Sequence, residues 1–138
     1  MPPIVAQALL ALTFLSASAF AAGTKYDQSV DCSHRDNLNN YELNQCQGRA
    51  IEKADVELGT AYKALMDRTL EAKRPLLVAA ERAWIAWRDR ECDLTAEVVD
   101  GYDKSGTGYG LSWGICRANL TTERTKQLRA YLREVQAR

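Results

Sequence analysis

Three stretches of the chain carry apolar residues at the spacing of an amphipathic helix. The first, from Asn39 to about Ala72, has the stripe Leu43, Ala50, Ala54, Leu58, Ala61 and Leu65. The second follows Pro75, which suits a first helical turn, and has the stripe Leu77, Ala80, Trp84, Trp87 and Leu94. The third closes the chain with Leu120, Leu128, Tyr131 and Val135. Because no stretch alternates like a strand, we predict an all-α fold, a small three-helix bundle whose first two helices form an antiparallel hairpin.

Two residues refine the first helix. Asn39 and Glu42 have the spacing of a capping box, so we expect the helix to begin directly after Asn39. Gly59 lies within the helix, where it costs about 1 kcal/mol relative to alanine. We expect a compensating notch at Gly59 that admits Trp84 or Trp87 from the facing helix.

The segment 101–114, before the third helix, is rich in glycine. It holds five of the eight glycines of the chain: Gly101, Gly106, Gly108, Gly110 and Gly114. Glycine leaves the backbone mobile, and aromatic side chains between glycines supply contact area at small entropic cost. We therefore predict a Gly-rich loop, which is either a linker or a binding surface. The candidate binding residues are Tyr102, Asp103, Lys104, Ser105, Tyr109 and Trp113.

The N-terminal region has the pattern of a signal peptide. Residues 4–20 carry no charge, and Ala19 and Ala21 have the small-x-small spacing of a cleavage site. We predict that residues 1–21 are removed and that residues 22–138 form one domain in the periplasm or outside the cell. No membrane span is expected after cleavage.

Export gives the four cysteines a structural meaning. Outside the cytosol an even number of cysteines most often forms disulfides, and four of them allow three connectivities. We favour Cys32–Cys46 and Cys92–Cys116, because each pair closes a local segment that contains a loop.

Charge and composition exclude several classes of function. The 18 Lys and Arg balance the 18 Asp and Glu, so no broad basic face for nucleic acid is expected. With His34 as the single histidine and no Cys-x-x-Cys motif, we expect no metal site and no Ser/His/Asp catalytic set. We predict no cofactor, no catalytic residues and no enzyme activity.

The neutral balance conceals an acidic segment at the end of the second helix. Between Asp89 and Asp103 lie six acidic residues and only one basic residue, Arg90. A helix C-terminus disfavours anions, so Asp93 and Glu97 need compensation. We expect Arg117 or Arg124 of the third helix to supply it; the alternative is that the acidic end receives a basic partner.

A set of residues spread along the chain resembles a known family in order and spacing. They are Gln45-Cys46, Ala54-Asp55, Leu58, Tyr62-Lys63, Leu65, Trp84, Arg88-Asp89, Cys92, Cys116, Thr121 and Arg124. The family is that of the N-terminal domain of the lysozyme inhibitor LprI, which was long described as a domain of unknown function in exported bacterial proteins. The resemblance implies a helical, disulfide-bonded, exported protein, and the named member of the family inhibits lysozyme.

The resemblance also assigns roles to particular residues. It implies a structural network of charges and hydrogen bonds between helices, formed by Asp55, Trp84, Arg88, Asp89 and Arg124. It implies lysozyme as the partner. On that basis we expect the 101–114 loop to fill the cleft of the enzyme, with Lys104 or Ser105 hydrogen-bonding its catalytic carboxylates. The alternative is a non-inhibitory interaction module of the periplasm that binds another envelope protein, a glycan or a small ligand.

Overall fold

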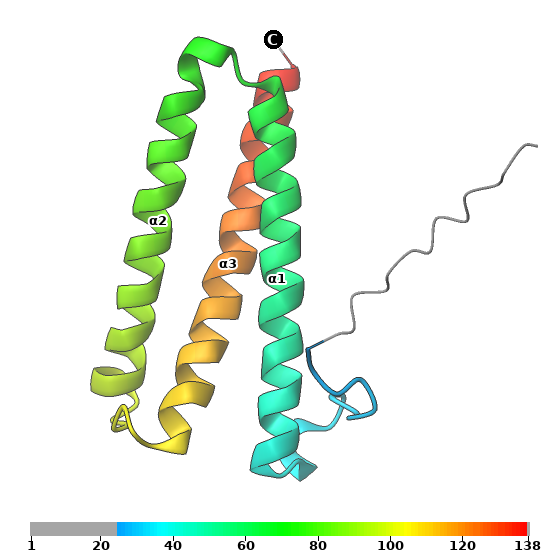
Figure 1. Ribbon diagram of the computed structural model, residues 1–138, viewed down its shortest axis with the longest axis vertical. Helices are drawn as coiled ribbons and strands as arrows, with labels where there is room; N and C mark the ends of the chain where they lie inside the picture. Colours follow the sequence, from blue (N-terminus) through cyan, green and yellow to red (C-terminus); the bar gives the residue numbers. More distant parts are fainter. Residues whose placement is uncertain (1–24, 138) are drawn as a thin grey trace, which may run out of the picture.

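The computed structural model describes residues 25–137, and the predicted signal peptide lies outside this range. Within it, three long helices form a bundle: α1 (Asn40–Arg68), α2 (Arg74–Leu94) and α3 (Thr107–Gln136) (Figure 1). Three short helical segments precede or connect them: η1 (Arg35–Asn37), η2 (Glu71–Lys73) and η3 (Thr95–Val99). Residues 25–137 contain no strand. The predicted all-α three-helix fold is confirmed.

Helix α1 begins at the residue predicted from the sequence but ends before the predicted end at Ala72. The Glu42 backbone N–H donates to Asn39 Oδ1 at 3.0 Å, and the Asn39 backbone N–H donates to Glu42 Oε2 at 2.9 Å, so the capping box is formed. The helix ends at Arg68, because Thr69 is extended and its hydroxyl donates to the Leu65 carbonyl at 2.8 Å. The chain then turns through η2, and Pro75 lies in the first turn of α2 as expected.

The core lies mainly between α1 and α3. Leu58, Ala61 and Leu65 of α1 pack with Leu128 of α3, and four partly buried residues surround them: Tyr62, Leu77, Trp84 and Leu132. Helix α2 runs antiparallel to α1 and joins this core through α3, while few contacts connect α1 and α2 directly (Figure 1). The hairpin topology is therefore present, but its two helices are held apart.

The separation of α1 and α2 overturns the expected notch at Gly59. A Cβ added at Gly59 would have no atom within 4 Å. Trp84 packs against the core, and Trp87 is about half exposed. Neither tryptophan packs against α1 at Gly59, because α2 packs mainly on α3.

The predicted Gly-rich loop is wrong in its second half. Helix α3 already begins at Thr107, so Gly108, Gly110 and Gly114 are helical. A Cβ at Gly114 would lie 2.8 Å from Gln47 Cγ, and one at Gly108 would collide with the Tyr102 ring. These two glycines therefore permit close packing rather than mobility.

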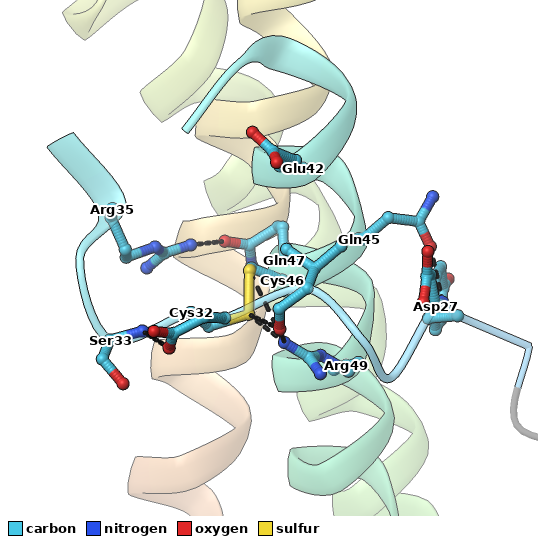
Figure 2. Close-up of a disulfide and its surroundings, with 12 residues drawn as sticks. Asp27, Cys32, Ser33, Arg35, Glu42, Gln45, Cys46, Gln47 and Arg49 are labelled. Carbon is cyan, nitrogen blue, oxygen red and sulfur yellow. Dashed lines mark hydrogen bonds between the residues drawn. A yellow bond between two sulfur atoms is a disulfide. The ribbon is translucent and has the colours of Figure 1, made fainter. Parts of the chain in front are cut away.

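Both favoured disulfides are present. Cys32–Cys46 joins the N-terminal arm to α1 with a Cα–Cα distance of 5.7 Å, and Cys92–Cys116 joins α2 to α3 with 5.5 Å. Around the first, Arg49 donates to the Val30 carbonyl at 2.6 Å, and Arg35 donates to Gln47 at 3.2 Å (Figure 2). Each bridge is expected to stabilise the fold by about 3 kcal/mol.

None of the helices within residues 25–137 has the length and apolar character needed to cross a membrane.

Substitution by alanine is expected to have opposite effects on stability at two helical glycines. Gly59→Ala should raise the free energy of unfolding by about 1 kcal/mol, because alanine is the better helix former and the added methyl meets nothing. Gly114→Ala should lower it by about 1–3 kcal/mol, because the methyl would meet the buried Gln47 side chain. Thermal unfolding of both variants checks this, and equal melting temperatures would contradict the packing described.

Candidate functional site

The acidic end of α2 is compensated by the turn that follows it. Lys104 Nζ lies 3.4 Å from Glu97 Oε1 and 3.8 Å from Asp93 Oδ2, and the Tyr109 hydroxyl donates to Asp93 Oδ1. The expected pairing with Arg117 or Arg124 is wrong. Gly101, at φ 72°, lets the chain fold back so that Lys104 reaches the end of α2.

The two arginines are used elsewhere in the bundle. Arg117 donates to Asp55 Oδ2 on α1 at 2.7 Å, and Arg124 donates to Glu81 Oε2 on α2 at 3.0 Å. They therefore link α3 to its two neighbours, one helix each.

The charges of the turn are held within the turn itself. Coulombic attraction, first to Asp93 and then to Tyr109, together with the contact to Glu97, raises the pKa of Lys104. Hydrogen bonds from the Ser105 hydroxyl and backbone N–H lower the pKa of Asp103. Lys104 is therefore already paired with the end of α2 and with η3, and Ser105 with Asp103 of the same turn.

Apolar residues are exposed beside this turn. Val98 and Val99 are 71% and 73% exposed, and Tyr102 is 46% exposed. Glu97, Asp100 and Asp103 lie next to them along the chain and are exposed as well. We call these six residues, Glu97–Asp100 and Tyr102–Asp103, the tip surface, because they occupy the end of the bundle where α2 passes into α3 (Figure 1).

The two exposed valines end a π-helical turn that follows α2. Residues 95–99 form a π-helical turn, with the Asp100 N–H donating to the Thr95 carbonyl at 2.9 Å. Such a wide turn shifts the helical register and is frequent at functional sites. Val98 and Val99 were not predicted as site residues; the available signal was an apolar pair beyond the end of the predicted stripe.

Of the six candidate binding residues, five lie in or next to the turn. Tyr102, Asp103, Lys104 and Ser105 belong to it, and Tyr109 reaches Asp93 from the first turn of α3. Trp113 lies one turn further along α3, where its ring faces the Arg117 guanidinium with 5.7 Å to the ring centroid.

The charged residues between the helices form three ion pairs, two of which flank Trp84. The Trp84 ring faces the Arg88 and Arg124 guanidinium groups, which lie 5.3 and 5.6 Å from its centroid. Arg88, which is buried, donates from Nε and Nη2 to Asp89 Oδ1 at 2.8 and 2.7 Å and from Nη1 to Thr121 Oγ1 at 3.3 Å. Both side chains of the Glu81–Arg124 pair are 10% exposed. Asp55 and Arg117 form the third pair.

This arrangement extends the network expected from the sequence. Trp84, Arg88, Asp89 and Arg124 lie together, with Glu81 paired to Arg124, while Asp55 pairs with Arg117 and makes no hydrogen bond or ion pair with the other four. Glu81 and Arg117 were missed as members, since a contact across helices leaves no local pattern in the sequence.

A groove lies where α1 and α2 stand apart. Its volume is about 590 Å³, and its walls include Leu58, Gly59 and Tyr62 of α1 and Val78 and Ile85 of α2. The charged residues that line it are Asp55, Glu81, Arg82, Arg88 and Arg117. We call this feature the α1–α2 groove. Within residues 25–137, no group of three His, Cys, Asp or Glu side chains is placed to hold a metal ion.

Comparison with known proteins decides the family. The family model described as "Lysozyme inhibitor LprI" matches residues 32–128, a range that contains all four cysteines and the network. The chain belongs to the lysozyme inhibitor LprI family. The resemblance seen in the sequence is thereby confirmed.

Two relatives match this LprI family member in sequence. It is 28% identical to the uncharacterized protein YecT of Escherichia coli strain K12, over 89% of this chain and 88% of the relative. It is also 28% identical to the uncharacterized protein R02472 of Rhizobium meliloti strain 1021, over 72% and 76% of the two chains. No solved structure matches it.

The Arg88–Asp89 pair predicts a stability effect rather than a binding effect. Asp89→Ala should lower the free energy of unfolding of this LprI family member by about 1–3 kcal/mol, because the buried guanidinium loses the acceptor of two of its three hydrogen bonds. Asp67→Ala is the matched control, since it breaks the exposed Lys63–Asp67 pair, which contributes about 0–1 kcal/mol. Denaturant unfolding of both variants measures the difference, and equal midpoints would contradict the structural role of Asp89.

Proposed function

We propose that this LprI family member is exported, loses residues 1–21, and inhibits a lysozyme in the bacterial envelope by binding over its cleft. Membership of the family supports the choice of target. The four cysteines, all paired, support an oxidising compartment. The tip surface supports a binding mode.

The observation that carries the binding mode is the exposed valine pair framed by carboxylates. Apolar residues gathered on an exposed surface mark interaction sites more often than chance, and interfaces have an apolar centre with a polar rim. Val98, Val99 and Tyr102 would form such a centre, and Glu97, Asp100 and Asp103 such a rim. The acidic rim would complement a basic surface around the lysozyme cleft and accelerate association.

The contacts of Lys104 and Ser105 change which residues we expect to touch lysozyme. Because Lys104 is held by Asp93 and Glu97, and Ser105 bonds Asp103, these two residues shape the turn rather than reach into a partner. We therefore assign direct contact to Val98, Val99, Tyr102 and Asp103, with Lys104, Ser105 and Tyr109 as supports. Two carboxylates at the floor of a lysozyme cleft are then covered by an apolar wedge rather than met by a lysine.

The double variant Val98→Ser/Val99→Ser tests this mode. Inhibition in a cell-wall turbidity assay against a panel of lysozymes should weaken at least about tenfold, because the apolar centre of the interface is lost. Helix content and melting temperature should stay unchanged, because neither side chain packs in the core.

The control is Val56→Ser/Leu70→Ser, which changes two residues that are 65% and 75% exposed on α1 and after it. It should inhibit like the unchanged protein. Full inhibition by the tip variant would exclude the tip surface as the contact. A protein that inhibits no lysozyme of the panel would favour the alternative, a non-inhibitory interaction module of the envelope.

A further inference from the structure

The α1–α2 groove has the size and lining of a site for a small organic ligand. Its volume of about 590 Å³ is within the usual range of such sites, about 300–1,000 Å³. Leu58 and Tyr62 on α1 face Val78 and Ile85 on α2 across it. The groove is separate from the tip surface, with which it shares no residue.

Gly59 keeps the α1 wall of this groove open. It lies in the middle of a 29-residue helix, where glycine costs about 1 kcal/mol relative to alanine. No neighbour requires its small size, since a Cβ there would meet nothing within 4 Å. The missing side chain therefore enlarges the groove and serves no packing contact in the bundle.

The groove carries one positive charge without a partner. Its acidic residues are paired, Asp55 with Arg117 and Glu81 with Arg124, and Arg88 is paired with Asp89. Arg82 is exposed at the rim and makes no ion pair or hydrogen bond with the described residues. An apolar groove with a single free guanidinium at its edge is complementary to an apolar chain with an anionic end.

The floor of the groove adds two buried polar atoms. Arg117 Nε and Glu81 Oε1 have no hydrogen-bond partner among residues 25–137, although the Glu81 side chain is nine-tenths buried. Leaving such atoms without partners costs about 1–3 kcal/mol each. A head group that offers an acceptor near Arg117 and a hydroxyl donor near Glu81 would remove this cost.

We propose that the α1–α2 groove binds a single-chain amphiphile with an anionic head group. The acyl chain lies between Leu58, Tyr62, Val78 and Ile85 in the space beside Gly59, and the head group pairs with Arg82. Free fatty acids and lysophospholipids share the acyl chain and the anionic end, and a lysophospholipid also carries a hydroxyl that could donate to Glu81.

Isothermal titration of the exported, oxidised protein tests the proposal with three probes below their micelle concentrations. Laurate and lauroyl-lysophosphatidylglycerol represent the two sources of the anion, and dodecyltrimethylammonium reverses the charge. At least one anionic probe should bind saturably at one site and at least about tenfold more tightly than the cation. Whichever anion binds more tightly identifies the source. Equal affinity for cation and anions, or no saturable binding, would overturn the proposal.

Two pairs of variants locate the binding. Gly59→Leu should fill the groove and weaken binding of the anion at least tenfold, while Gly110→Leu, at another helical glycine with nothing within 4 Å, should not. Arg82→Gln should weaken binding of the anionic probes and leave binding of the cationic probe unchanged. Arg90→Gln, which changes an exposed arginine outside the groove, should not weaken binding of the anionic probes.

Binding that survives Gly59→Leu in a protein that melts no lower than the unchanged protein would place the ligand elsewhere and refute the site. A concentration-dependent dimer that Gly59→Leu abolishes would show instead that a second copy occupies the groove. Because lysozyme inhibition is assigned to the tip surface, these variants should leave inhibition unchanged, so the two proposals fail separately.

Discussion

The close approach of α1 to α3 is the constraint on which the rest of the structure depends. It requires small residues where the helices meet: Gly114 lies against Gln47, and Ala54, Ala61 and Ala118 are buried. Helix α2 packs mainly on α3 and reaches the shared core through Leu77 and Trp84. It makes few direct contacts with α1, and the α1–α2 groove lies where these two helices stand apart.

Helix α2 then needs anchors of another kind. Leu77 and Trp84 reach the core, but the remaining links to α3 are polar or covalent: Glu81 to Arg124, Arg88 to Thr121, and Cys92 to Cys116. A buried ion pair adds little net stability, because desolvation offsets most of the attraction. Its geometry is demanding, however, so the two arginines that flank Trp84 define where α2 lies along α3.

The parts of this fold that local rules govern could be predicted from the sequence. The apolar stripes, the Asn39–Glu42 capping box and Pro75 are local signals, and both disulfides close short segments. The partners of Arg117 and Arg124 could not be predicted, because Asp55 and Glu81 lie 62 and 43 residues away and meet them only in the folded bundle. Lys104 replaced them at the end of α2 since the backbone at Gly101 reverses direction there.

The glycines show most clearly why the candidate sites could not be predicted from the sequence alone. The same residue type reverses the chain at Gly101, admits a neighbouring helix at Gly114 and leaves space open at Gly59. From the sequence, Gly101 and Gly114 were predicted to lie in one mobile loop, and Gly59 was predicted to form a packing notch. What distinguishes them is the neighbour that each glycine meets, and Gly59 meets none. At Gly59 the helix gives up stability without a packing contact in return, and a ligand in the proposed groove would supply the compensation.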